Sequence, residues 1–187
     1  MSLTVAITLL RGINVGGRHK ISMESLRLMY ADLGFPDAKT YIQSGNVVVR
    51  IRKPDLANFA GKVESTIERV VGFRPKVIVR TISEMRKVIA GNPFASRREI
   101  ESNKLQVMFL DRHPSAGRRK LIHEIKSDPE EMHFAGREAY IYFPKGMGQS
   151  KLPLAAIERS LNVAWTGRNW NTFTKLLEIA EAMKDAG

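Results

Sequence analysis

Residues 39–51, Lys-Thr-Tyr-Ile-Gln-Ser-Gly-Asn-Val-Val-Val-Arg-Ile, carry the pattern that decides the fold. Two runs rich in β-branched and aromatic side chains, 39–43 and 47–51, flank the short polar segment Ser44-Gly45-Asn46. Gly and Asn tolerate positive φ, which a tight turn between two antiparallel strands requires. The stretch therefore predicts a β-hairpin.

Strand and helix patterns surround this hairpin on both sides. Residues 4–11 are apolar on both faces, as in a buried strand, and Ser22 is placed to cap an amphipathic helix that ends at Gly34. After the hairpin, residues 54–72 predict a second helix and residues 75–81 predict another strand. The predicted order of the first half is therefore β-α-β-β-α-β.

The rest of the chain repeats this order. Strands are expected at 104–110, 133–135, 139–143 and 163–166, and helices at 82–90, around Leu121, Ile122 and Ile125, at 153–161, and at the C-terminus with Phe173, Leu176, Leu177, Ala180 and Met183 on one face. We predict an α+β fold of two ferredoxin-like halves, with antiparallel sheets covered by helices. The predicted domains are residues 1–81 and 82–187, the second including a linker helix and the C-terminal helix.

Composition excludes several classes of protein. The 187 residues are 43% hydrophobic and 26% charged, which is typical of a globular protein and unlike a disordered chain. The longest apolar runs are far shorter than the roughly 20 residues of a membrane span. The first residues show no basic and apolar leader, so a cytoplasmic protein is expected. Cysteine is absent and the four histidines are not spaced as ligand pairs, so we expect no metal and no cofactor.

The charge balance points toward anionic partners. Lys and Arg number 30 against 19 Asp and Glu, a formal net charge of +11. A field of this sign attracts nucleic acids and phosphorylated metabolites, although many basic proteins are simply soluble. Local clusters occur at Arg50–Lys53, Arg97-Arg98 and Arg118–Lys120.

The glycine-rich loop after the first strand is a candidate anion site. Gly12 and Gly17 have the spacing of a phosphate-binding loop, but Arg18 and His19 stand where that loop needs Lys and then Ser or Thr. Magnesium-dependent nucleotide hydrolysis is therefore not expected. Backbone N–H groups at a corner between a strand and a helix still favour an anion, and the alternative is a plain turn. The candidate binding residues are Arg11, Asn14, Gly16, Gly17 and Lys20.

Two further segments could bind an anion. Lys145 and Lys151 flank a second glycine loop before a helix, and Arg168-Asn169 follow the last predicted strand. The alternative for the latter segment is that Asn171 or Thr172 caps the last helix and Trp170 belongs to the core. Ser44 has no assignable base beside it, so no nucleophile is nominated.

Four blocks of sequence resemble a known family. They are Leu10–Gly17, Gln43–Val47, Asn92–Phe94 and Arg168–Thr172. These blocks are similar to signature segments of the bacterial proteins grouped as domain of unknown function 1697. The resemblance implies two ferredoxin-like halves, and it implies no substrate or mechanism.

Polar residues at the ends of predicted elements suggest where function lies. We hypothesise that Arg11, Asn14, Asn46 and Arg168 converge on one anion-binding cleft, with Ser44 at the neighbouring hairpin tip. The predicted function is a binding module for a phosphate-bearing ligand, either nucleic acid or a nucleotide-like molecule. The alternatives are an enzyme acting on a small anionic substrate and a protein-interaction module. No membrane association is expected, and the sequence predicts no oligomeric state.

Overall fold

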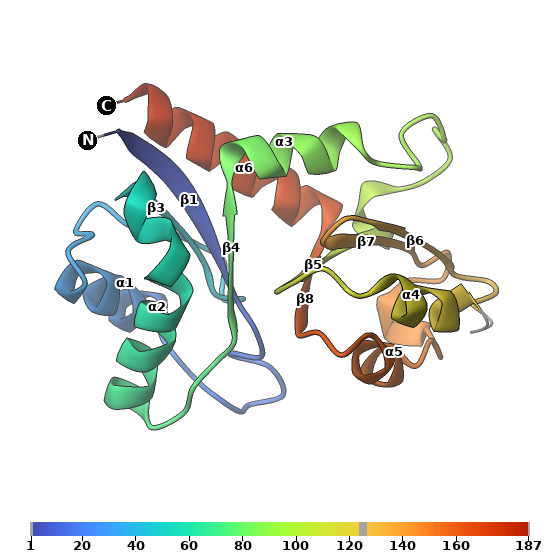
Figure 1. Cartoon of the computed structure of the whole chain (residues 1–187), viewed down its shortest axis with the longest axis horizontal. Coiled ribbons are helices and arrows are strands. Elements are labelled where there is room, and N and C mark those ends of the chain that lie inside the picture. Colours follow the sequence, from blue (N-terminus) through green and yellow to red (C-terminus); the bar gives the residue numbers. More distant parts are fainter. Residues whose placement is uncertain (1, 124–126, 187) are drawn as a thin grey trace. The chain divides into compact units, whose positions relative to one another are not determined.

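The computed structural model describes residues 2–123 and 127–186, and its strands form two antiparallel sheets (Figure 1). The first contains β1 (Leu3–Leu10), β2 (Lys39–Tyr41), β3 (Asn46–Arg52) and β4 (Val77–Thr81), in the order β2-β3-β1-β4. The second contains β5 (Leu105–Leu110), β6 (Glu131–Ala135), β7 (Glu138–Tyr142) and β8 (Trp165–Asn169), in the order β6-β7-β5-β8. The two orders are equivalent, which confirms the predicted duplication of a ferredoxin-like sheet.

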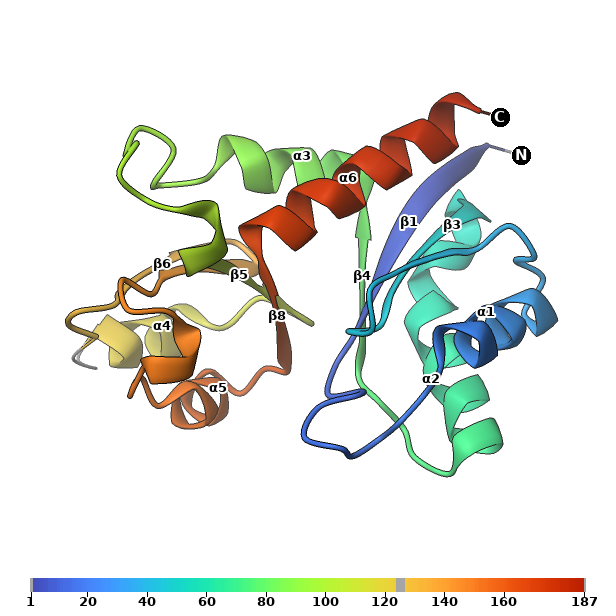
Figure 2. The same ribbon diagram turned by 180° about the vertical axis from the view of Figure 1, so that it is seen from behind.

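Helices cover one face of each sheet. α1 (Met23–Asp32) and α2 (Leu56–Val71) pack on the first sheet, and α4 (Ala116–His123) and α5 (Leu154–Leu161) pack on the second (Figure 2). The remaining helices are α3 (Ile82–Ala90) and α6 (Trp170–Asp185), with short 3-10 turns η1 (Lys53–Asp55), η2 (Ser102–Lys104) and η3 (Met147–Gln149). The fold is therefore α+β, as predicted. None of the described helices is long and apolar enough to cross a membrane.

The chain divides into two compact units. The first unit comprises residues 1–87 and 175–187, and the second comprises residues 88–174. The boundaries thus fall inside α3 and α6. The predicted division into residues 1–81 and 82–187 concerns folding domains and stays a prediction.

The core of the first unit lies between its sheet and helices α1 and α2. Alternation along β1 sends Ala6, Thr8 and Leu10 toward these helices, where they meet Leu26 and Tyr30. The Thr8 hydroxyl, fully buried, lies 2.6 Å from the Tyr30 hydroxyl and so has a partner in the core. A hydroxyl group in the core needs such a hydrogen-bond partner, because it has lost its contacts with water.

Local signals account for most element boundaries. Ser22 caps α1, because its Oγ accepts the N–H of Ser25 at 2.9 Å, and Gly72 ends α2 in the left-handed region. The last strand is displaced from its predicted range, 163–166, to Trp165–Asn169. β2 ends at Tyr41 instead of residue 43, since Ile42 has a φ of 48°. The expected helix position Ile125 lies outside the described residues.

The two units repeat the same backbone hydrogen bonds. Leu10 N–H donates to Gly45 O at 2.8 Å, and Leu110 N–H donates to Arg137 O at 2.9 Å. Likewise, Arg11 N–H and Asp111 N–H donate to carbonyls that precede β4 and β8, each at 2.9 Å. These bonds fix the end of the first strand of each unit beside its neighbours.

A buried glutamate also recurs in each unit. Glu64 on α2 accepts the N–H of Val77, the first residue of β4, and Glu158 on α5 accepts the N–H of Trp165, the first residue of β8, both at 3.0 Å. A carboxylate that accepts a backbone N–H at this depth ties a helix to a strand. The two units therefore share this buried glutamate contact as well as their strand order.

Candidate functional site

The glycine loop of the first unit folds as a small hairpin. Residues 12–20, here called the glycine hairpin, turn at Gly16 and Gly17, whose φ angles are 57° and 76°. Val15 and Arg18 form an antiparallel bridge across this turn. Positive φ at two successive residues is the signature of the tight turn that suits a right-twisted hairpin. The glycine spacing thus builds a turn, and α1 begins at Met23, directly after its predicted cap Ser22.

Asn14 holds the glycine hairpin against the β2–β3 turn. Its Nδ2 donates to the carbonyls of Ile21 and Gln43 at 2.9 and 2.8 Å, and its Oδ1 accepts the N–H of Ile21 at 2.9 Å. Asn46 is fully buried and donates to Tyr41 O at 3.0 Å. Both amides therefore have structural roles, and their predicted contact with a ligand stays a prediction.

The β2–β3 turn itself admits only glycine at its centre. Gly45 has a φ of 73°, and an added Cβ would lie 2.6 Å from Ile13 Cδ1 and 2.7 Å from Leu10 Cβ. Ser44, beside it, is half-buried. The first two family-like blocks of the sequence therefore pack directly against each other.

Basic side chains surround a pocket of about 350 Å³ at the base of the glycine hairpin. Arg11, Gly12 and His19 line it from the hairpin side, and the segment Phe73–Lys76 lines it from the approach to β4. The His19 ring stacks on Phe73 with centroids 4.4 Å apart and an interplanar angle of 26°. Lys20 is exposed on the same hairpin.

Two carboxylates hold the cations on this side. Arg74 Nη2 and Lys76 Nζ lie 3.3 and 3.5 Å from Glu64, and Arg74 Nη1 lies 3.0 Å from Glu68. Hydrogen bonding to Glu68 and then to Glu64 raises the pKa of the Arg74 guanidinium, so it stays charged. Glu64 is nearly buried, with 10% of its side chain exposed, whereas Arg74 and Lys76 are 44% and 42% exposed. The side chains of Arg74 and Lys76 are therefore exposed to solvent, whereas Glu64 is largely shielded from it.

The predicted residues of the second unit are divided between loop and strand. Lys145 and Lys151 are exposed on either side of η3. Arg168 lies inside β8, paired with Val107 of β5, and it is buried. Its Nη1 donates to Thr166 Oγ1 at 2.9 Å and to Gly167 O at 2.7 Å, while burial lowers its pKa to about 10.

Asn169 caps the last helix. Its Oδ1 accepts the N–H of Thr172 at 2.8 Å, at the position where an N-cap side chain acts. The suggested caps Asn171 and Thr172 are therefore wrong, because both lie inside α6, which begins at Trp170. Arg11 and Arg168 belong to different units, and their convergence on one cleft stays a prediction.

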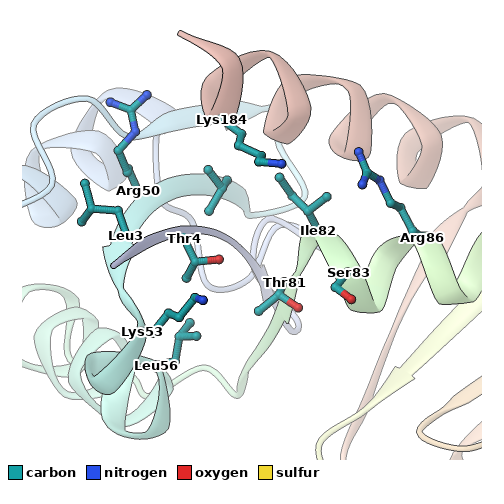
Figure 3. A pocket seen from close by; sticks show the side chains of 11 residues that line it. Leu3, Thr4, Arg50, Lys53, Leu56, Thr81, Ile82, Ser83, Arg86 and Lys184 are labelled. Carbon is teal, nitrogen blue, oxygen red and sulfur yellow. The ribbon is translucent and has the colours of Figure 1, made fainter. Parts of the chain in front are cut away.

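A larger pocket of the first unit, about 700 Å³, was not predicted. Its cationic lining residues are Arg50, Lys53, Arg86 and Lys184, and we call it the basic pocket. Figure 3 shows Lys184 reaching in from α6 and Lys53 from the segment after β3. No Asp or Glu occurs among the described residues that line it.

The floor of the basic pocket is largely apolar. Leu3 comes from β1, Leu56 from the start of α2, and Ile82 from the start of α3 (Figure 3). Val5 of β1 also lines the pocket. Thr4, Thr81 and Ser83 add hydroxyl groups. Such a pocket, apolar with a few convergent polar groups, is the usual form of a small-molecule site.

Its arginines are held by neighbours within the first unit. Arg86 lies 2.8 Å from Glu181 through both Nε and Nη2. Arg50 donates to the carbonyl oxygen of Met183 and lies 3.9 Å from Asp37. One sign of this site is visible in the sequence, the charge cluster Arg50–Lys53. The other segments meet only in the folded chain.

The fold and these sites define an α+β protein with a duplicated ferredoxin-like framework and basic pockets in its first unit. The chain belongs to the family described as Protein of unknown function (DUF1697), whose sequence model matches residues 3–140. That range contains three of the four family-like blocks and excludes Arg168–Thr172.

A solved structure shares this fold. The chain is similar to "conserved bacterial protein SP0830 from Streptococcus pneumoniae", with 20% sequence identity and a TM-score of 0.72 over 96% of this chain and 99% of that chain. At this level of identity the likeness shows the fold alone. No curated protein matches the chain.

Proposed function

We propose that this protein binds a phosphate-bearing small molecule of nucleotide-like character in the basic pocket of the first unit. The observation that supports this most strongly is the lining itself, with four cations and no acidic side chain among its described residues. Its volume of about 700 Å³ falls within the range of small-molecule sites.

The four cations have complementary roles. Arg50 and Arg86 are oriented by Met183 O and Glu181, so their planar groups are fixed before a ligand arrives. Lys53 and Lys184 are exposed ammonium groups on flexible stems. Lysine binds phosphate as a point charge, and arginine binds it through paired donors. Together they suit a ligand with more than one anionic oxygen.

The apolar floor favours a ligand larger than a free phosphate ion. Leu3, Leu56 and Ile82 offer no hydrogen bond, and covering them with a flat or apolar group removes that surface from water. The Ser83 hydroxyl at the start of α3 adds a polar contact. A nucleoside phosphate combines such a body with an anionic end.

The lining favours binding over catalysis. Carboxylates and imidazoles, the commonest general bases, do not occur among the described residues of the basic pocket. An enzyme acting on the same ligand would need such a group. We therefore place the enzymatic alternative second.

Titration calorimetry with ATP, adenosine and inorganic phosphate tests this proposal. We expect ATP to bind more tightly than either fragment, and the affinity to fall between about 50 and about 200 mM salt. Lys184→Glu should weaken ATP binding by about tenfold or more, because one charged contact contributes about 1.5–3 kcal/mol. Lys62→Glu makes an equal charge change on the exposed side of α2. It should leave the ATP affinity within about twofold of the parent value, because salt screens a charge outside the pocket. Absence of ATP binding at low salt, or equal losses in the two variants, contradicts the proposal.

A further inference from the structure

The surface around the glycine hairpin combines cations with a stacked aromatic pair. Arg18, His19 and Lys20 are exposed on this hairpin, and Arg11 is exposed immediately before it. Arg74 and Lys76 are exposed on the segment that leads into β4. We propose that this surface, here called the hairpin face, binds single-stranded nucleic acid. It is a site separate from the basic pocket, and the proposal does not depend on what that pocket binds.

The aromatic pair is suited to stacking an unpaired base. Phe73 is half-buried and supports the exposed His19 ring at 4.4 Å. The His19 Nδ1 lies 3.1 Å from Gly12 O, which further fixes the orientation of the ring. Unstacked bases of single strands pack on aromatic side chains, including histidine, and every base offers a flat face. A preformed platform costs little ordering on binding.

The cations lie where a phosphate backbone would pass. Arg11, Arg74 and Lys76 line the same pocket as His19 and Phe73. Glu64 lies beneath Arg74 and Lys76 with its carboxylate nearly buried, and Glu68 is the other acid in contact with Arg74. Arg18 and Lys20 extend the positive surface along the hairpin. A groove that combines backbone charges with a stacking ring is typical of single-strand binding.

A duplex fits this surface less well. In a duplex the base faces are stacked on one another, so an aromatic side chain reaches them only after a base is unstacked at a cost of a few kcal/mol. Direct readout of a duplex groove uses side chains that contact base edges. The stacked ring pair of the hairpin face serves an exposed base instead, which is why the partner is assigned as a single strand.

Fluorescence anisotropy with labelled oligothymidylate of about 15 nucleotides tests this inference. We expect binding at about 50 mM salt, weaker binding to a duplex of the same length, and an affinity that falls with salt. Arg18→Ala with Lys20→Ala should make the slope of log K against log salt shallower by about 1.4, since each lost phosphate contact on a single strand contributes about 0.7. Lys62→Ala, which removes one exposed charge from α2, is the control and should leave the slope unchanged.

The stacking contact is tested by a pair of variants at one position. His19 has a φ of 50°, so His19→Ala and His19→Phe impose the same backbone strain. His19→Ala should weaken binding about tenfold, whereas His19→Phe retains a ring and should bind within about twofold of the parent protein. Equal losses in both variants, a preference for duplex, or no binding at low salt overturns the inference. Lys184→Glu should not alter oligonucleotide binding, which separates this result from failure at the basic pocket.

Discussion

The first and second units share a framework and differ in what their loops present to solvent. At the end of β1 the first unit places Arg11, which leads into the exposed glycine hairpin. At the same place, after β5, the second unit has Asp111, whose Oδ1 accepts the N–H of Ala164 at 3.0 Å. Arg11 is therefore exposed to solvent, whereas its counterpart Asp111 hydrogen-bonds to the backbone before β8.

The shared framework extends to buried charge. Arg80 in β4 donates to Val79 O at 2.9 Å, and Arg168 in β8 donates to Gly167 O at 2.7 Å. In the strand register, Arg80 is paired with Ile7 of β1, and Arg168 is paired with Val107 of β5. This repetition teaches that Arg168, which the sequence suggests as a ligand clamp, occupies a framework position. The pocket at the glycine hairpin, by contrast, is lined by residues outside the strands and helices that the two units share.

The hairpin glycines provide the largest expected contrast between units. Gly45→Ala places a Cβ against Ile13 and Leu10 and strains a φ of 73°, so it should lower the free energy of unfolding by about 3 kcal/mol or more. Gly136→Ala has the same kind of strain at 64° but ordinary contacts at 3.8 Å, and should cost about 1 kcal/mol. Urea unfolding of both variants measures the difference, and equal losses would show that the close approach of Ile13 is unimportant.

Two asparagines in the left-handed region provide the next contrast. Asn14 has a φ of 55° and Asn162 a φ of 53°, but Asn14 also makes three hydrogen bonds through its amide. Asn14→Ala should therefore cost about 4 kcal/mol, from about 1 kcal/mol for each of the three bonds and about 1 kcal/mol for the left-handed backbone. Asn162→Ala should cost about 1 kcal/mol, from strain alone. Thermal and urea unfolding test this ranking, which a larger loss at Asn162 would reverse.

Alkaline pH should weaken the framework through its buried tyrosines. Burial raises the pKa of Tyr140 to about 12 and also raises that of Tyr30 in the first unit. Between the unfolded pKa of about 10 and the folded value, the unfolded chain holds fewer protons, so stability falls as pH rises. Stability below pH 10 is unaffected by this ionisation.

Replacing Tyr140 measures its share of this dependence. Tyr140→Phe removes one titrating group, and the plot of unfolding free energy against pH should become shallower by about 1.4 kcal/mol per pH unit between pH 10 and 12. Tyr30→Phe should act in the same direction. A slope identical to that of the parent protein would mean that Tyr140 is accessible to water in the folded state.

The smallest effect on stability is expected at Arg86. Its ion pair with Glu181 is largely exposed, with side chains 59% and 36% accessible, and such pairs contribute about 0–1 kcal/mol after screening. Arg86→Gln should therefore leave the unfolding midpoint nearly unchanged while weakening ATP binding several-fold. Arg97→Gln in the second unit should lower the unfolding midpoint and leave ATP binding unchanged. The reason is that Arg97 lies over Phe94 and Tyr142 and pairs with Glu131. If the two variants changed the unfolding midpoint and the ATP affinity alike, the proposed difference in function between the units would be wrong.

Local chemistry explains why the fold could be predicted from the sequence. Ser22, Gly72 and the β2–β3 turn each specify their own geometry within a few residues, and the alternation of apolar side chains gives the strands. The end of β8 could not be found in this way, because Gly167 and Asn169 are poor strand formers. Pairing with Met108 and Gln106 of β5 overrides that preference.

The candidate sites were less accessible to such reasoning. Arg11 and Lys20 carry a visible charge pattern, and both lie on the hairpin face as exposed residues. The stacking of His19 on Phe73 and the meeting of Lys53 with Lys184 depend on contacts between distant segments. Asn14 and Asn46 look like binding residues because amides bind ligands, yet amides also donate hydrogen bonds to backbone carbonyls, as they do here.

The central claim is that the first unit carries the ligand site on a framework it shares with the second. An NMR titration of isotopically labelled protein with ATP tests it most directly. The account predicts that backbone amide shifts concentrate at Thr4, Lys53, Ser83 and Lys184, while amides of β5 to β8 stay in place. Shifts confined to residues 88–174, or no shifts at ATP concentrations that saturate micromolar sites, would contradict it.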